Sequence, residues 1–552
     1  MQYLLKAVLS LLASVALASG ALATDRTSAK VTRVFIFAGQ SNMVGSDSKA
    51  ADIEHFPPFA GLDEPQAKVK FSYKIGREDK QVSDGWSELA PVRGVVGPEL
   101  SFARKVASKV DDSIAIIKCA AGGTHLGGDW SPDDPTGFKM YPLLLELVRS
   151  SLADLDKSGI KYRVEGFFWH QGENDMFDET FLQNYGANLS NFVAKVRRDL
   201  DCPELRFFVG ELCTKTVWGM DMRPKMYAVS LGQGQVAAND PLVDYVRTSH
   251  IGVEIGGGGG LHYHYGTLGQ LEHGVNYADA YLATQGLQDA PSAPLKKWPH
   301  KKGKTVQLFV LAGHRNMEGE RAFTQELRSL PKGKSLLKDN EKVPFRYSLG
   351  GGYKTSNGWE ALGPRGYYET FGPELSFGRL LQGTLKEPIA IAKFTHSGSQ
   401  IIDWTPEGSE AETRNLYPDF IAFIKESIDA LRSAGNRVEL AGIFYHVGEN
   451  DMSFYPYREQ AALRVQALVR ESRSDLKAPD LYWYISQQPP TDHEGVNQSD
   501  VTARLREVAA KDEHIIHMEA FDLPKQSKQL VLDTAAIVGL GEILAKAYLE
   551  RL

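Results

Sequence analysis

Short apolar runs alternate along this chain with longer segments in which apolar residues recur every three or four positions. In the first half, the apolar runs predict strands at 33–38, 113–118, 164–169, 206–211 and 243–248. The amphipathic segments predict helices at 99–109, 141–156, 178–199, 223–238 and 267–283. Strands that alternate with helices are typical of a doubly wound α/β fold, so we expect a central parallel sheet between helices.

The first of these strands leads into the most informative stretch of the chain, VFIFAGQSNMVG at 34–45. Four consecutive apolar residues predict a strand that is buried on both faces. Small and polar residues follow, and they place the hydroxyl of Ser41 just past the carboxyl end of the strand, where ligands bind in open α/β sheets. A helix-capping serine would give the same local pattern.

An internal repeat covers the chain from this stretch to its end. The segments return in the same order and at nearly constant spacing, which indicates a tandem duplication. We therefore predict a first domain at 24–290, a Pro- and Lys-rich linker at 291–304 and a second domain at 305–552. The matching segments are 34–45 and 308–319, 84–91 and 357–364, 96–104 and 371–379, 114–123 and 389–398, 129–132 and 403–406, 165–176 and 441–452, and 268–282 and 538–549.

The N-terminal residues 1–23 have the features of a secretory signal peptide. Lys6 precedes an apolar run, and Ala21-Leu22-Ala23 provides a cleavage site. We expect an exported protein, secreted or periplasmic, with no later membrane span. The net charge of −7 is mixed along the chain and contains no basic stretch, which argues against nucleic acid as a partner.

The three cysteines, Cys119, Cys202 and Cys213, are expected to remain unpaired. Cys202 and Cys213 flank a predicted strand that would hold them roughly 30 Å apart, whereas a disulfide needs Cα atoms within about 7 Å. Cys119 follows an apolar run and is expected to be buried.

Several residues near the predicted strand ends could carry out acyl transfer, which needs a nucleophile, a base, a group that orients the base, and donors for the oxyanion. Ser41 is the candidate nucleophile, and Gly122 or Gly123 and the Gln171 amide are candidate donors. Glu173 is a nearby carboxylate, and His264 precedes the last helix. The glycines could equally form only a turn, and Gln171 and Glu173 could only fasten loops.

A metal site is the alternative interpretation of these histidines, because His262, His264 and His273 could bind zinc together with a carboxylate. No second carboxylate or cysteine is suitably spaced. The run Gly256–Gly260 lacks the Gly-Lys-Ser/Thr ending of a phosphate loop.

Several motifs in order resemble one known family, the sialate O-acetylesterases and acetylxylan esterases, which are SGNH-type carbohydrate esterases. The resemblance implies two tandem SGNH-hydrolase-like (flavodoxin-like) three-layer α/β domains and a cofactor-free serine esterase that removes acetyl groups from carbohydrate. The motifs are GQSNM at 39–43, GPE at 97–99, GGT at 122–124 with Trp130, WHQGEND at 169–175 and HYGTLGQ at 264–270.

The resemblance also implies roles for individual residues. Ser41 matches the nucleophile and His264 the base, with His262 as the other candidate for the base. The backbone of Ser41, Gly123 and the Gln171 side chain match the oxyanion donors. The family often places an Asp three residues before the His, where this chain has Leu261, so the acid role is assigned to Glu173 instead.

The second copy lacks this set and is expected to be catalytically inactive. Arg315 stands in place of Ser41, Ser397 of Gly122, Val447 of Gln171 and Thr534 of His264. Two other functions stay open, namely a glycan-binding protein without turnover and a carboxylesterase or lipase on other esters. The oligomeric state is not predicted.

Overall fold

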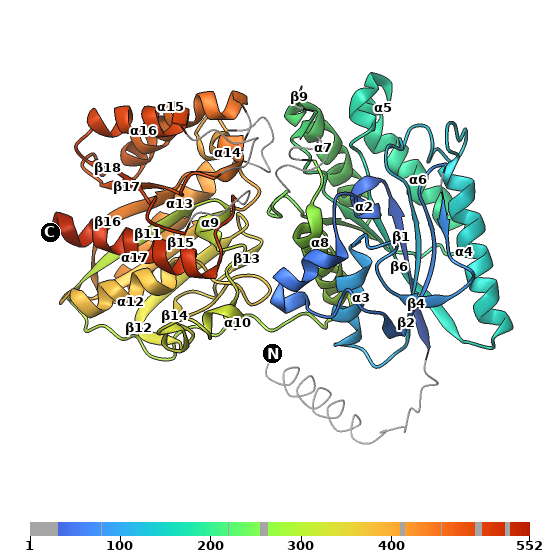
Figure 1. The fold of residues 1–552 in the computed structure, drawn as a ribbon, viewed down its shortest axis with the longest axis horizontal. Helices are drawn as coiled ribbons and strands as arrows, with labels where there is room; N and C mark the ends of the chain where they lie inside the picture. Colours follow the sequence, from blue (N-terminus) through green and yellow to red (C-terminus); the bar gives the residue numbers. More distant parts are fainter. Residues whose placement is uncertain are drawn as a thin grey trace, which may run out of the picture.

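In a computed structural model, the chain forms two α/β domains that lie side by side (Figure 1). The structure describes residues 31–552 except 79, 219, 254–262, 409–414, 454, 492–498 and 525–529, and the side chains of residues 455 and 456 are also left out. The predicted signal peptide therefore lies outside the described residues.

The first domain is built on an 8-stranded, mostly parallel sheet. The first strand, β1 (Thr32–Gly39), lies in its middle, with β5 (Ile114–Ala120) on one side and β6 (Tyr162–His170) on the other. The strand order thus reverses beside β1, and its carboxyl end is the point at which such sheets bind ligands. The remaining strands are β2 (Gln66–Ile75), β3 (Gln81–Val82), β4 (Ser87–Leu89), β7 (Phe207–Gly210) and β10 (Val243–Val246).

Helices cover both faces of this sheet and create two cores. Alternate residues of β1 point to opposite faces, so Val34, Ile36 and Ala38 pack in one core while Phe35 and Phe37 pack in the other. The first core is covered by α4 (Met140–Lys157), α6 (Tyr185–Asp199) and α7 (Arg223–Asn239), and the second by α3 (Glu99–Ala107) and α8 (Gly266–Thr284).

These elements confirm the predicted α/β class and the predicted strands and helices of the first half. One predicted helix, 178–199, is divided at Asn184 into α5 (Glu179–Gln183) and α6. The sheet also contains β2, β3 and β4, which were not predicted; β3 and β4 pair antiparallel with β2. The first copy's smaller elements are α2 (Ser41–Val44), η1 (Ala50–His55), η2 (Pro57–Phe59), η3 (Asp175–Phe177), β8 (Thr216–Val217) and β9 (Met220–Asp221).

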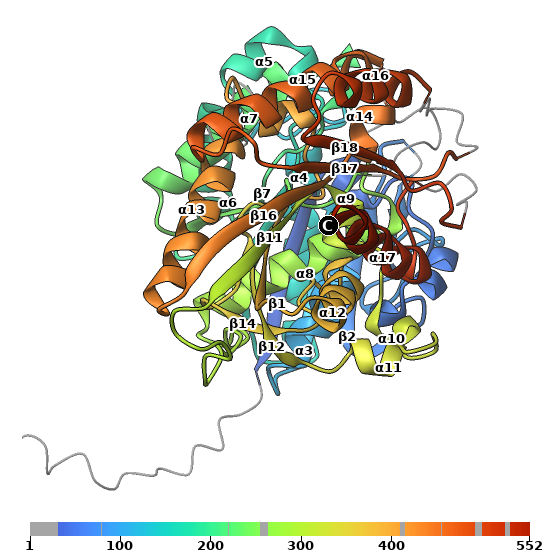
Figure 2. The same cartoon turned by 90° about the vertical axis from the view of Figure 1, so that its left-hand side faces the viewer.

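The second domain repeats this architecture with the same strand order (Figure 2). Its sheet contains β11 (Thr305–Gly313), β12 (Asn340–Leu349), β13 (Lys354–Thr355), β14 (Glu360–Leu362), β15 (Ile389–Thr395), β16 (Arg437–His446), β17 (Trp483–Gln487) and β18 (Ile515–Glu519). Its helices are α9 (Arg315–Glu318), α10 (Thr324–Leu327), α11 (Gly333–Leu336), α12 (Glu374–Thr384), η4 (Ile401–Trp404), α13 (Tyr417–Ser433), α14 (Glu449–Ser453), α15 (Tyr455–Asp475), α16 (Ser499–Ala510) and α17 (Thr534–Arg551).

Buried polar contacts are duplicated along with the fold. Lys118 and Glu99 form an almost fully buried ion pair of 2.7 Å, and Lys393 and Glu374 repeat it at 2.7 Å. Each ammonium also donates to a carbonyl at the end of the short helix after the first strand, that of Val44 in the first copy. The Glu of the GPE motif therefore supports the segment that carries Ser41.

The connecting segment between the copies packs on the second domain. Leu295 donates its backbone N–H to Trp359, and the Trp298 indole donates to the side chain of Asn436.

All three cysteines are free thiols, and Cys119 is buried as predicted. Within the described part of the chain, no helix is both long and apolar enough to cross a bilayer.

Candidate active site

Ser41 lies where the sequence predicts it, directly after β1 at the first residue of α2. The residue is 9% exposed. Helix α2 is only four residues long and ends at Gly45, whose φ of 99° lies in the left-handed region. A Cβ at Gly45 would lie 2.0 Å from the carbonyl oxygen of Val96, so the tight turn requires glycine.

The Gly122-Gly123 turn after β5 lies against Ser41. A Cβ on Gly122 would be 3.4 Å from the Cβ of Ser41. Gly123 has a φ of 72°, a conformation that glycine adopts without strain. The structure thus brings the predicted nucleophile and the predicted backbone donor together at adjacent strand ends.

Gln171, the predicted side-chain donor, is fully buried, and its amide is already engaged. Its Nε2 donates to the Thr124 carbonyl at 3.0 Å and to the Asp175 carboxylate, while its Oε1 accepts from the Tyr185 hydroxyl. Asp175 also accepts from the backbone N–H groups of Leu126 and Gly127. These contacts hold the 122–127 loop in place, and both amide hydrogens of Gln171 are used in doing so.

Asn174 offers the side-chain amide that faces the Gly123 turn, and the sequence analysis did not single it out. Its Oδ1 accepts from Gln40 at 3.3 Å, which orients the amide and leaves Nδ2 as the donor. Nδ2 lies 4.0 Å from the position that a Cβ on Gly123 would occupy. The sequence could have indicated this residue, because Asn174 belongs to the Gly-x-Asn-Asp end of the WHQGEND motif.

Replacing Asn174 by alanine is expected to lower kcat on a small acetyl ester by about 10²- to 10³-fold, the usual cost of removing one oxyanion donor. KM should change little because the donor acts on charge that develops in the transition state. Steady-state kinetics test this, with circular dichroism to confirm folding. A kcat within threefold of the wild type would show that Asn174 is not an oxyanion donor.

The backbone on both sides of His264 is held by Asn42, the residue that follows Ser41. The Asn42 side chain donates to the Tyr263 carbonyl at 2.8 Å and accepts from the Tyr265 backbone N–H at 3.3 Å. The Nδ1 of His264 is 2.6 Å from the Oδ2 of Asp47. The carboxylate that contacts the predicted base is therefore Asp47, six positions after the predicted nucleophile.

Glu173 contacts Asn42 rather than the His264 ring. Its Oε1 accepts from the Asn42 Nδ2 at 2.6 Å, and burial raises the pKa of this carboxyl to about 7. Glu173 thus supports the residue that fixes the backbone on both sides of His264. Its predicted role as the acid is not supported by a direct contact and stays a prediction.

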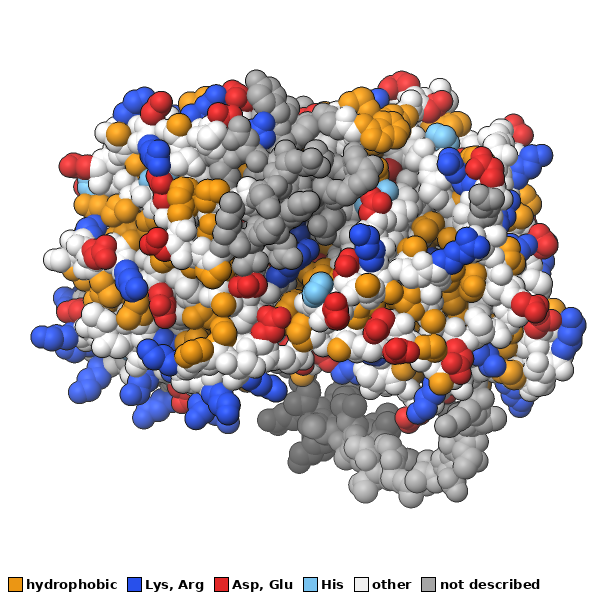
Figure 3. Space-filling model, in the orientation of Figure 1, with side chains coloured by type: hydrophobic (Ala, Val, Ile, Leu, Met, Phe, Trp, Pro, Cys, Tyr) orange, Lys and Arg blue, Asp and Glu red, His pale blue; other side chains and the backbone are white. Residues whose placement is uncertain are grey.

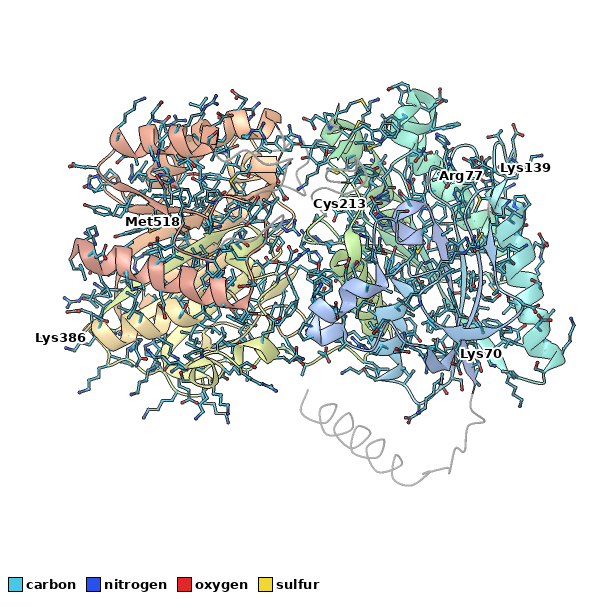
Figure 4. The ribbon with its side chains drawn as sticks, in the orientation of Figure 1. Lys70, Arg77, Lys139, Cys213, Lys386 and Met518 are labelled. Carbon is cyan, nitrogen blue, oxygen red and sulfur yellow. The ribbon has the colours of Figure 1, made fainter. Side chains whose placement is uncertain are left out.

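Arg77 lies at the rim of the site. One of its guanidinium nitrogens is 3.0 Å from the position of a Cβ on Gly123, and the guanidinium stacks on the Phe138 ring at 5.0 Å. Its side chain is exposed, and Figure 4 shows it on the first domain near Lys139. Acidic and basic side chains are interspersed over the face of the molecule in Figure 3.

One histidine of the alternative metal site lies outside the described residues and another is buried in a helix. His262 and Leu261 lie outside the described residues. His273 is fully buried in α8, where its ring packs against those of His170 and Tyr277. No cluster of three His, Cys, Asp or Glu residues with metal-binding geometry occurs among the residues that the structure describes.

A family model described as "Carbohydrate esterase, sialic acid-specific acetylesterase" matches residues 31–283 and again residues 305–550. The chain belongs to this family. Its members are carboxylic ester hydrolases, and the match to both halves agrees with the tandem duplication. The predicted family is thereby confirmed.

Individual relatives align with one copy. A probable carbohydrate esterase of Arabidopsis thaliana is 23% identical over 274 residues, which is 46% of this chain and 90% of that protein. A crystal structure of NanS is 17% identical and covers 47% of this chain and 98% of its own, with a TM-score of 0.36. A carbohydrate acetylesterase from Xanthomonas citri is 18% identical and covers 44% of this chain and 55% of its own, with a TM-score of 0.33.

In this two-copy esterase, the structural counterpart of the active site in the second domain is packed against the first domain. Arg315, at the position of Ser41, is 3% exposed and forms a two-bond ion pair with Glu320. Its other terminal nitrogen donates to the Val253 carbonyl of the first domain at 3.1 Å. A Cβ on Gly398, the counterpart of Gly123, would lie 1.8 Å from the Ser249 carbonyl oxygen. The first domain therefore fills the space that a substrate would need.

The structure corrects one position of the sequence alignment between the two copies of the esterase. The Thr534 hydroxyl accepts from the backbone of Phe323, and the Thr267 hydroxyl accepts from the equivalent Lys49. Thr534 therefore matches Thr267. Asn316 repeats the bonds of Asn42 with Leu530 and Leu532, so the residue at the place of His264 is Val531. Valine cannot act as a base either, so the second copy still lacks this group.

Proposed function

We propose that the first domain is a serine esterase that removes acetyl groups from carbohydrate. The observation that carries this proposal is the pairing of His264 with Asp47 at the strand end that bears Ser41. Because Asp47 engages Nδ1, the Nε2 of the imidazole is available to the serine hydroxyl.

The proposed reaction has two steps. The Ser41 oxygen attacks the acetyl carbonyl carbon while His264 takes the hydroxyl proton, and His264 then donates that proton to the departing sugar oxygen. The backbone N–H groups of Ser41 and Gly123 and the Asn174 amide would stabilise the oxyanion. Water, activated by His264, then hydrolyses the acetyl-enzyme and releases acetate.

Asp47 is the proposed orienting acid, and Glu173 is the alternative. Asp47 touches the ring, whereas Glu173 is buried and has a pKa near 7, so it carries only part of its charge at neutral pH. A partly charged carboxyl is a weaker stabiliser of an imidazolium than an ionised one.

The compartment and the role of the second domain are also proposals. The sequence of residues 1–23 supports export. The replacement of Ser41 and His264 by Arg315 and Val531 supports an inactive second domain. Its contacts with the first domain support a structural role.

The activity should rise with pH through a pKa below 6.5. Burial lowers the pKa of His264, with Asp47 partly opposing this shift. The reaction needs the neutral imidazole, so the rate falls as pH drops through that pKa. In Asp47→Asn, the carboxylate that raises the pKa of His264 is lost. The fall of kcat/KM on the acid side of its pH profile (the acid limb) is therefore expected at still lower pH. A limb above pH 7 in the wild type would contradict this.

Acetate release from a panel of acetylated mono- and polysaccharides by the wild type and by Ser41→Ala tests the proposed function. Release by the wild type alone supports it. Glycan binding without release would favour a binding protein, and hydrolysis confined to lipid esters would favour a carboxylesterase or lipase.

A further inference from the structure

A cavity of about 720 Å³ lies between the two domains. Its wall in the first domain comes from α8, the end of β10 and Lys105 of α3, and its wall in the second domain comes from β12, β13 and the loop before α12. The connecting segment at 288–292 closes one side. Ser41 and the other proposed catalytic residues do not line it.

Four cations line this cavity, and two of them have no carboxylate within ion-pair distance among the described residues. Lys105 is paired with Asp279 at 2.5 Å, and Arg365 is paired with Glu360 at 3.1 Å and with Asp339 at 3.0 Å. The remaining cavity carboxylate, Asp289, is 2.6 Å from Lys109.

Arg247 and Lys354 are the two cations that remain. Among the described residues, the Lys354 ammonium donates to the Gly366 carbonyl at 2.7 Å, and Glu360 and Asp279 act on its pKa without forming an ion pair with it. Burial lowers its pKa to about 8, so it carries its charge at pH 7. The half-buried Arg247 guanidinium contacts no carboxylate in the described part of the chain. Partly buried cations that lack an ion pair are only partly compensated, and an anionic ligand would supply the missing charge.

The cavity also presents aromatic surface and hydrogen-bonding groups. Tyr347, Tyr353, Tyr367 and Tyr368 line it, and the buried Tyr367 hydroxyl has no hydrogen-bond partner among the described residues. Large cavities lined by aromatic rings and a few polar groups are typical of small-molecule sites. A guanidinium and an ammonium together recognise a carboxylate.

We propose that this interdomain cavity binds a carboxylate-bearing saccharide, with Arg247 and Lys354 as the groups that recognise the carboxylate. The choice of a saccharide rests on the proposed function, whereas the choice of an anion rests on the unpaired cations alone. The site would give the inactive second domain a part in holding acidic glycan.

Isothermal titration of the full-length protein at pH 7 with D-glucuronate and with D-glucose tests this proposal. The two sugars have the same ring size and differ in the carboxylate. Glucuronate is expected to bind at least tenfold more tightly than glucose. Arg247→Met and Lys354→Met should each weaken glucuronate binding at least fivefold, whereas Lys386→Met, an exposed lysine at the far edge of the second domain (Figure 4), should not.

Equal affinity for the two sugars, or binding that neither cavity variant weakens, would overturn the proposal. Loss of binding in Asn174→Ala with full binding in Arg247→Met would also overturn it, because the ligand would then occupy the catalytic site. Hydrolysis of a small acetyl ester by each cavity variant shows that it is folded. The same assay reports separately on the proposed function, since the titration needs no turnover.

Discussion

Replacing Ser41 by alanine is expected to lower ester hydrolysis by at least about three orders of magnitude while leaving the fold intact. Loss of a triad nucleophile removes the covalent step, and only binding and oxyanion contacts are left to accelerate the reaction. Ser41 is largely buried at a strand end, but the change removes only the hydroxyl oxygen and keeps the Cβ, so it opens little space. Hydrolysis of p-nitrophenyl acetate and thermal unfolding measure the two effects.

Ser46→Ala is the matched control, because Ser46 lies in the same segment and no hydrogen bond from its side chain occurs among the described residues. It should retain near-normal activity. Turnover by Ser41→Ala within tenfold of the wild type would contradict the serine mechanism.

Asp47→Asn is expected to lower kcat by about 10²- to 10³-fold, and Glu173→Gln by less than tenfold. The equivalent Asp-to-Asn change in a serine protease triad costs about 10⁴-fold. Asp47 is 38% exposed, so water should replace part of its effect on the His264 imidazolium. Glu173→Gln keeps an oxygen that can accept from Asn42 and so preserves the backbone around His264.

The two carboxylates are also distinguished by pH. Asp47→Asn should move the acid limb of kcat/KM, whereas Glu173→Gln should leave it in place because Glu173 does not contact the ring. Glu54→Gln, which alters an exposed carboxylate on the nearby η1, should change neither kcat nor the limb. The reverse ranking of Asp47→Asn and Glu173→Gln would make Glu173 the acid.

The sequence was sufficient to place Ser41 and the Gly122-Gly123 turn. Both follow continuous apolar runs, and a parallel strand buried on both faces is the simplest element to recognise. Because the carboxyl ends of parallel strands share one edge, the order of the strands did not need to be known. The duplication was equally clear, since it rests on matching segments rather than on structure.

The hydrogen-bond partners could not be predicted in the same way. Gln171 and Asn174 are three residues apart in one motif, and only the fold shows that the first amide is buried and the second faces Gly123. Asp47 follows a turn that depends on the left-handed Gly45, so its approach to His264 is a tertiary contact. Strand β2 was not predicted because it has no continuous apolar run; its apolar and polar residues are mixed. It lies near the edge of the sheet, where it pairs antiparallel with β3.

The alignment of the last helix failed for a different reason. Thr534 was matched with His264 by the apolar pattern of the helices that follow. The segments before these helices differ in length between the copies, so pattern alone did not fix the register. The hydrogen bonds of Thr267 and Thr534 do so, because both hydroxyls accept from equivalent backbone positions.

In the proposed mechanism, one serine in the first domain performs the chemistry and the second domain performs none. Treatment with a fluorophosphonate, which reacts with activated serines, followed by peptide mass spectrometry tests it most directly. We expect one adduct per chain, on the peptide that contains Ser41, and its loss in His264→Ala. An adduct on a serine of 305–552, or full activity in protein whose Ser41 is quantitatively modified, would show that Ser41 does not perform the chemistry alone.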